Sequence, residues 1–181
     1  MAVTVAAGCV YGGLMGYVNS SQQIFQGIFA TGALYPVWFG GLALFMAAAT
    51  LTNARLLRRH TMQTICMAAL GVHCVWTGLA LTADLLTGGL GLGWFLGYNA
   101  VTLFALGLTF GNFNAMALLP FGQIAGAAAA MQATVLTLVS LMAAAVIGNL
   151  FDGTLVPVLA GYLAMGLTAL LLLRLPAASV L

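Results

Sequence analysis

The scarcity of charged residues constrains this chain more than any other feature of its sequence. Four arginines and two aspartates are the only charged residues among 181, whereas 64% of the residues are hydrophobic. In soluble globular domains about a quarter of the residues are charged, because the surface faces water. A folded surface with so few charges must lie mostly against hydrocarbon, so we expect an all-α membrane protein in contact with the lipid bilayer. The small net charge of +2 gives no reason to expect a nucleic-acid partner.

The apolar residues fall into six segments, each long enough for a helix to cross a bilayer. Such a crossing takes about 20 mostly apolar residues, and short connections separate the segments. The predicted spans of this single transmembrane bundle, residues 1–181, are 3–25, 34–52, 64–86, 92–118, 123–150 and 155–173. Because the connections are short, we expect neighbouring helices to be antiparallel.

The placement of the charges agrees with six crossings. Arg55, Arg58 and Arg59 lie between the second and third spans, and Arg174 follows the sixth span. Six crossings put these four arginines on one side of the membrane and both aspartates on the other. Positively charged residues mark the cytoplasmic side. We therefore expect both termini to lie in the cytoplasm.

Small residues recur every four positions in three of the predicted spans. They are Gly8, Gly12 and Gly16 in the first span, Gly93 and Gly97 in the fourth, and Gly122, Gly126 and Ala130 in the fifth. This spacing lets helix backbones approach closely in lipid, where packing replaces the hydrophobic driving force. We expect close packing between helices of the same chain at these positions.

A weak internal repeat links the second and fifth spans. Residues 33–36, Ala-Leu-Tyr-Pro, resemble residues 117–120, Ala-Leu-Leu-Pro, and the match continues without gaps to Ala49-Thr50 against Ala133-Thr134. Three crossings separate the two stretches, so their orientations in the membrane would be opposite. We therefore predict two inverted three-helix repeats, an arrangement that is typical of transporters.

Three stretches resemble one transporter family. Residues 111–126, Gly-Asn-Phe-Asn-Ala-Met-Ala-Leu-Leu-Pro-Phe-Gly-Gln-Ile-Ala-Gly, resemble the junction between the tenth and eleventh helices of bacterial drug:proton antiporters. These belong to the major facilitator superfamily, in the branch that includes bicyclomycin and chloramphenicol resistance pumps. Residues 17–25 look like the seventh helix of that branch, and residues 53–59, Asn-Ala-Arg-Leu-Leu-Arg-Arg, look like its loop between helices eight and nine. The chain departs from the branch at Leu119, where an acidic residue is common.

The resemblance covers essentially the whole chain but only half of the family's fold, with the six spans equivalent to helices seven to twelve. It implies multidrug efflux by proton antiport across the bacterial inner (plasma) membrane, with lipophilic drugs as substrates. The amino-terminal half of the family, which commonly contributes the coupling carboxylates, is missing. We therefore expect a carboxyl-terminal half that is inactive alone and needs a six-helix amino-terminal half or a second copy as partner.

Several polar side chains inside the spans are candidates for the substrate cavity. Polar groups within a span tend to face the interior of a bundle, because they cost free energy in lipid. The candidates are Asn19, Gln22, Gln23, Tyr98, Asn99 and Gln132. For Gln132 a second role stays open, that of tying two helices together. Asn112 and Asn114 are expected to hydrogen-bond at the junction of the fourth and fifth spans.

Two further sets of residues carry functional hypotheses with a structural alternative beside each. The resemblance implies that Asn53, Arg55, Arg58 and Arg59 form a loop that latches the cytoplasmic gate through salt bridges; the alternative is plain topogenic charge. His73 is an ionisable residue near mid-membrane and a candidate proton relay. The alternative for His73, which we expect, is a neutral histidine hydrogen-bonded to a neighbouring helix.

The sequence favours neither an enzyme nor a metal or cofactor protein. Its three cysteines form no Cys-x-x-Cys pair, so no zinc site is indicated. Ser140 lacks the Gly-x-Ser-x-Gly setting of a nucleophile. The alternative to a transporter half is a free-standing six-helix channel or structural membrane protein, which water or glycerol flux through proteoliposomes would test.

Overall fold

The computed structural model describes residues 2–174, which form six long α-helices. These are Ala2–Gln22 (α1), Tyr35–Leu56 (α2), Met62–Thr87 (α3), Leu92–Leu118 (α4), Ala125–Asn149 (α5) and Val156–Arg174 (α6). The described part of the chain contains no strand, which confirms the all-α class. Each helix begins and ends within a few residues of a predicted span, because hydropathy alone fixes where the apolar segments lie.

Five helical segments of the described chain are long and apolar enough to cross a membrane. One of them, Leu92–Asn149, is 58 residues long, because the 3-10 helix Leu119–Ile124 (η3) joins α4 to α5 without a loop. The chain reverses inside η3, where Phe121 leaves helical geometry at φ −112° and ψ 27°. The molecule thus has the helices of a multi-pass membrane protein.

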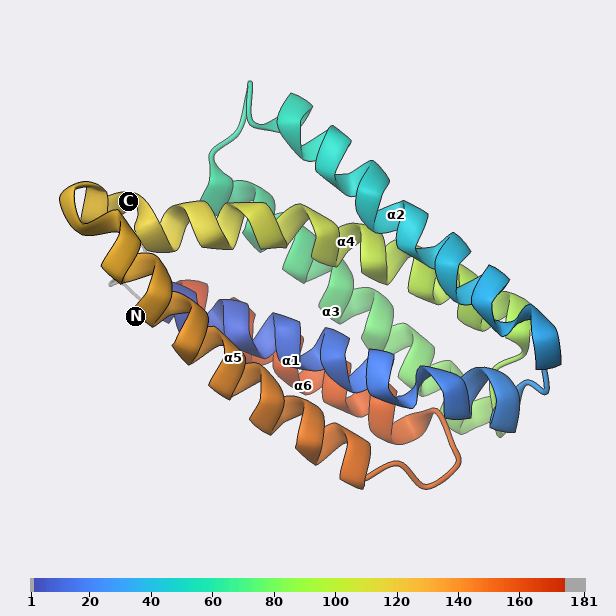
Figure 1. Ribbon diagram of the computed structural model, residues 1–181. Helices are drawn as coiled ribbons and strands as arrows, with labels where there is room; N and C mark the ends of the chain where they lie inside the picture. The colour runs from blue at the N-terminus through green and yellow to red at the C-terminus, as the bar shows by residue number, and fades with distance from the viewer. Residues whose placement is uncertain (1, 175–181) are drawn as a thin grey trace.

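Successive helices run in opposite directions along the bundle (Figure 1). The α2–α3 connection, the turn at η3 and the end of α6 lie toward one end, which we call the arginine end because Arg55, Arg58, Arg59 and Arg174 lie there. The other three connections lie at the opposite end, the aspartate end, with Asp84 and Asp152. The charges of the chain are therefore separated along the length of the bundle.

Helix α1 lies at the centre of the helix packing. It contacts α4, α5 and α6, while α4 also packs against α2 and α3, and α3 packs against α6. In the most apolar part of the first helical segment 67% of the residues are buried, compared with 11% in the segment of α2. Much of α2 and α5 is consequently exposed, including large side chains such as Leu44 and Met142.

The glycine repeat of α1 lies in close contact with α5. A Cβ atom added at Gly12 would lie 2.4 Å from Cβ of Ala143 in α5, and one added at Gly8 would lie 2.7 Å from Cβ of Val139. Gly16 faces Ile147 in the same way. The predicted close packing within the chain is confirmed for this repeat.

The same expectation is wrong for the glycines of the other two repeats. An added Cβ would have no neighbouring atom within 4 Å at Gly93, Gly97, Gly122 or Gly126. These residues lie on faces of α4, η3 and α5 that no other helix within residues 2–174 covers. Spacing alone therefore does not distinguish a packed glycine face from an open one.

The end of α1 passes into a different kind of helix. Residues Gln23–Ile28 (η1) form a π-helix, so the first helical segment extends beyond the predicted span 3–25. The chain then turns through Ala30 and Gly32, both with positive φ, at +50° and +53°. A short 3-10 helix, Gly32–Leu34 (η2), leads into α2, with Pro36 in its first turn, where proline loses no hydrogen bond.

Candidate functional site

A single exposed stripe runs along the otherwise buried helix α1. Tyr11, Met15, Asn19 and Gln22 follow one another at intervals of three or four residues, so they share one face of the helix. Asn19 and Gln22 are exposed, Met15 is 36% exposed and Tyr11 is half-buried. We call these four residues the α1 stripe; it combines a phenol, a thioether and two amides.

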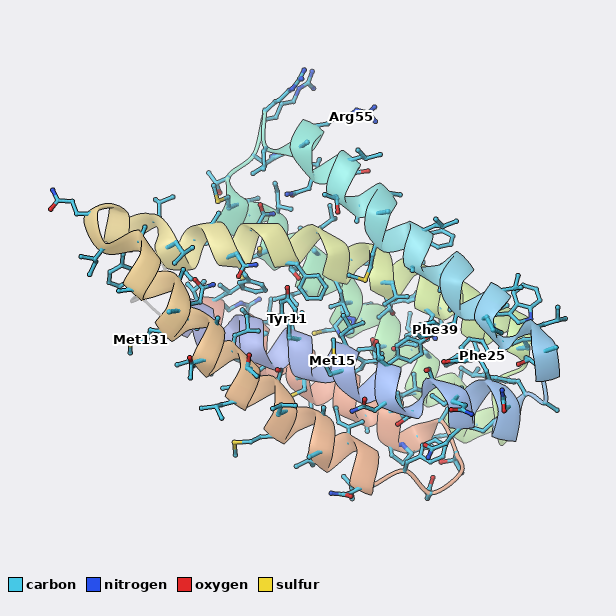
Figure 2. The ribbon with its side chains drawn as sticks, in the orientation of Figure 1. Tyr11, Met15, Phe25, Phe39, Arg55 and Met131 are labelled. Atoms are coloured by element: carbon cyan, nitrogen blue, oxygen red, sulfur yellow. The ribbon has the colours of Figure 1, made fainter. Side chains whose placement is uncertain are left out.

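The α1 stripe continues onto α4 through one aromatic contact. The ring of Tyr11 lies against that of Phe110, with 4.2 Å between the centroids, and Figure 2 shows Tyr11 in the space between α1 and α4. Gly111 and Asn114, which follow Phe110 on α4, are exposed. The polar and aromatic groups on this side of the bundle therefore come from both α1 and α4.

An aromatic cluster fills the space between helices at the aspartate end. It consists of Tyr17, Phe25, Phe29, Tyr35, Phe39, Phe95 and Tyr98. The ring centroids of Phe29 and Phe95 lie 5.1 Å apart, and those of Tyr35 and Phe39 lie 5.7 Å apart. Phe25 and Phe39 are labelled in Figure 2. Rings at such distances attract one another beyond their buried area, so this end of the bundle is firmly packed.

Two amide contacts tie α4 to its neighbours at the arginine end. Asn53 Nδ2 donates to Asn112 Oδ1 at 3.1 Å, and Asn112 Nδ2 donates to Asn53 Oδ1 at 2.8 Å, which joins α2 to α4. Gln132 Nε2 donates to Asn114 Oδ1 at 2.9 Å, which joins α5 to α4. Asn114 thus bonds across the α4–α5 junction as the sequence predicts, and Gln132 ties these two helices together. The prediction is wrong for Asn112, whose side-chain partner in another helix is Asn53 of α2.

Gln132 also lines a small hollow at the arginine end. The hollow has a volume of about 200 Å³, and its lining includes Thr4, Phe121, Met131 and Val135. The side chain of Gln132 is only 8% exposed, and its Oε1 atom has no hydrogen-bond partner among the described residues. The hollow therefore has a mostly apolar lining, and the unpartnered Oε1 atom of Gln132 is itself buried.

The structure places Tyr98 and Asn99 in the interior rather than beside the α1 stripe. Both side chains are almost fully buried. The hydroxyl groups of Tyr98 and Thr77 lie 3.2 Å apart, which links α4 to α3. Asn99 Nδ2 donates to the carbonyl oxygen of Phe95 at 3.3 Å. Gln23, another of the predicted cavity residues, is exposed at the start of the π-helix.

His73 is buried between α3 and α6. Its Nε2 atom lies 3.2 Å from the carbonyl oxygen of Tyr162, and the His73 and Tyr162 rings meet edge to face at 5.5 Å. Gly166 lies so close that an added Cβ would be 2.6 Å from the His73 ring. The expected contact with a neighbouring helix is therefore present.

The arginine loop and the two aspartates lie at opposite ends of the bundle. Arg55 ends the last turn of α2, and Arg58 and Arg59 follow it in an exposed turn. Asp84 Oδ1 instead accepts a hydrogen bond from the backbone of Leu90 at 2.8 Å. The carboxylates are therefore too distant to latch the loop within this chain.

Asp152 fixes the connection between α5 and α6. Its Oδ1 atom accepts hydrogen bonds from the hydroxyl and the backbone N–H of Thr154, at 2.6 and 2.9 Å. These bonds favour the ionised carboxylate, first through the hydroxyl and then through the N–H, and they lower the pKa of Asp152 below its ordinary value.

No metal site is formed by the described part of the chain. Residues 2–174 contain no group of three histidine, cysteine or acidic side chains that could hold an ion. Cys9, Cys66 and Cys74 are buried and unpaired.

The sequence interpretation did not identify Tyr11, Met15 or Phe110 as site residues. The spacing of Tyr11 and Met15 with Asn19 and Gln22 was the available signal, since it marks one helix face.

Comparison of the chain with models of known protein families, with curated proteins and with solved structures finds no match.

Proposed function

We propose that this chain is a six-helix half of a drug transporter of the major facilitator type, and that a second half covers the α1 stripe. The observation that carries the proposal is the stripe itself. Tyr11, Met15, Asn19 and Gln22 interrupt the burial of the most buried helix. Polar groups within a membrane normally face a protein interior or a water-filled cavity, so the stripe favours a cavity between two halves.

The helix packing supports an inverted repeat. Suppose that α1 is exchanged with α4, α2 with α5 and α3 with α6. The α1–α5 contact then becomes the α4–α2 contact, and the α1–α6 contact becomes the α4–α3 contact, both of which are present. The contacts α1–α4 and α3–α6 are unchanged by the exchange. A pseudo-two-fold axis that relates three-helix units of opposite orientation would produce this scheme.

The chemistry of the exposed surfaces favours lipophilic substrates. The stripe offers aromatic, thioether and amide groups, and the hollow beside Gln132 adds a mostly apolar wall. Sites for small molecules are mostly apolar, with a few polar groups that fix orientation. A lipophilic cation or neutral drug with a hydrogen-bond donor suits both surfaces, and rocking of the two halves would provide alternating access.

The proposed topology has six crossings of the bacterial inner membrane, with the arginine end in the cytoplasm. Single cysteines introduced at Arg59 and at Gly153 in a cysteine-free chain test this arrangement. A membrane-impermeant thiol reagent applied to intact cells is expected to label the cysteine at position 153 and to spare the one at position 59. Labelling of both positions, or the reverse pattern, would contradict the proposed orientation.

Ethidium efflux from cells that lack their own exporters tests the function. With this chain alone we expect no efflux unless a second copy completes the cavity. When a six-helix amino-terminal half is co-expressed, we expect ethidium efflux. The double substitution Asn19→Leu and Gln22→Leu should abolish the efflux. The control is Thr168→Leu, an exposed residue of α6 whose hydroxyl bonds only to its own helix.

Efflux that survives the double substitution would refute the cavity role of the stripe. Water or glycerol flux through proteoliposomes of the chain alone, without drug efflux in any combination, would instead favour the channel alternative.

A further inference from the structure

A second hollow lies on the outside of the bundle, between α2 and α3. Both helices pack along α4, yet α2 makes no extensive contact with α3. The hollow runs along α3 and α4 beside the end of α2, which contributes Leu56 to its lining, and it has a volume of about 330 Å³. We call it the α2–α3 groove; Thr64, Ala68 and Val72 line it from α3, and Val101, Phe104 and Leu108 line it from α4.

The α2–α3 groove is apolar along its length and polar at one end. Thr64, Ala68 and Val72 repeat every four residues and so extend about 12 Å along α3. Val72 and Val101 are 53% and 38% exposed, so the groove opens to the surroundings of the bundle. The polar lining groups, His60 and Thr64, lie at its arginine end.

The polar end of the groove carries most of the positive charge of the protein. Arg58, Arg59 and His60 are consecutive and exposed in the α2–α3 turn, and Arg55 precedes them by one helical turn. Three of the four arginines of the chain thus lie at this end, whereas both aspartates lie at the other. Nothing in the turn itself offsets this charge, so an anionic group there is strongly favoured.

We propose that the α2–α3 groove binds one anionic phospholipid of the cytoplasmic leaflet. An acyl chain occupies the apolar part between α3 and α4, and the headgroup phosphate lies against Arg58, Arg59 and His60. Basic pockets between transmembrane helices on the cytoplasmic side bind such headgroups. A free phosphate ion would leave the apolar length of the groove empty, and a zwitterionic phospholipid would bring a cationic group next to the arginines together with its phosphate.

The α2–α3 groove has a role separate from transport, because it does not include the α1 stripe. The arginines of the turn need no carboxylate of this chain if a lipid phosphate neutralises them. The binding proposal rests on the membrane location of the protein and not on the identity of any exported compound. A negative result for lipid binding would leave the efflux proposal untouched, and a negative efflux result would leave the lipid-binding proposal untouched.

Native mass spectrometry of the purified full chain tests the proposal. The protein in detergent is titrated with dioleoyl-phosphatidylglycerol or with dioleoyl-phosphatidylcholine, which have the same acyl chains and differ in headgroup charge. We expect one tightly retained phosphatidylglycerol per chain and much weaker retention of phosphatidylcholine. The double substitution Arg58→Gln and Arg59→Gln should weaken phosphatidylglycerol binding about 25-fold, or about 5-fold for each arginine.

Two control variants separate the groove from general surface attraction. Arg174→Gln removes a charge at the end of α6, which takes no part in lining the groove, and should leave binding within about two-fold of the wild type. Ala68→Phe fills the apolar part of the groove and should reduce phosphatidylglycerol binding at least about ten-fold. Ala160→Phe, at an exposed position of α6, should not.

Three results would overturn the proposal. Equal retention of the two lipids would show that headgroup charge has no role. Loss of binding in the arginine variant but not in Ala68→Phe would place the lipid on the surface turn alone. A dimer without bound lipid that Ala68→Phe dissociates would assign the groove to a second copy of the chain.

Discussion

Gly12 in α1 offers a quantitative test of the helix packing. In Gly12→Ala the new Cβ would lie 2.4 Å from Cβ of Ala143 and 3.2 Å from the carbonyl oxygen of Ser140. Carbon atoms in van der Waals contact are about 3.5–4.0 Å apart, so α1 and α5 would have to separate by about 1 Å. Overpacking of this kind typically costs about 1–3 kcal/mol. We therefore expect Gly12→Ala to lower the free energy of unfolding by that amount.

A double-mutant cycle assigns this loss to one contact. Ala143→Gly removes the clashing methyl group, so the double variant should recover part of the stability, while the backbone atoms of Ser140 and α5 prevent full recovery. The assay is reversible unfolding in detergent micelles, followed by circular dichroism. Gly97→Ala is the matched control, since its added Cβ meets nothing within 4 Å, and it should change stability by less than about 0.5 kcal/mol.

Two outcomes would refute the proposed packing of α1 against α5. One is a Gly12→Ala variant as stable as the Gly97→Ala control. The other is an additive double variant, because additivity would mean that the two positions do not interact.

Three further predictions concern single contacts. Asn53→Ala breaks both hydrogen bonds with Asn112 and should cost about 1–2 kcal/mol in the same unfolding assay, in line with interhelical hydrogen bonds in membranes; a variant as stable as the wild type would contradict the amide pair. Gly166→Ala places a Cβ 2.6 Å from the histidine ring of α3 and should cost about 1–3 kcal/mol, whereas an unchanged unfolding curve would show that α3 and α6 are farther apart. Thr154→Val removes the hydroxyl donor to Asp152 and should raise the pKa of that carboxyl toward its ordinary value, as measured by carbon NMR of the side chain. The pKa of Asp152 is lower in the folded than in the unfolded chain, so the stabilisation that the ionised carboxylate gives is present at neutral pH and is lost as the pH falls through the folded-state pKa. An unchanged titration of Asp152 in Thr154→Val would contradict the Thr154 contact.

Hydropathy was sufficient to predict the helices but not their contacts. The six α-helices follow from apolar length alone, which the bilayer dictates. The glycine repeats show where this reasoning stops. Gly12 and Gly97 both belong to four-residue repeats, yet only Gly12 meets another helix. The difference depends on which faces become neighbours in three dimensions, and helix spacing does not contain that information.

The sequence likewise predicts the placement of some residues of the candidate site and not of others. Asn19 and Gln22 share an exposed helix face with Tyr11 and Met15, and their spacing could be found in the sequence. Tyr98 also carries a polar group but is buried against α3. A polar residue within a span can satisfy its hydrogen bonds by facing a cavity or by bonding to another helix. The choice depends on residues far away in the chain.

The central position of α1 has a consequence for biogenesis. Its glycine face is covered by Ala143 and its neighbours in α5, which are synthesised roughly 130 residues later than Gly12. At about 5–20 residues per second this delay is on the order of ten seconds. During that time α1 must wait in the membrane with its glycine face uncovered, a state that is open to capture by membrane chaperones or to proteolysis. The glycine face of α1 would thus be packed only after α5 has been made.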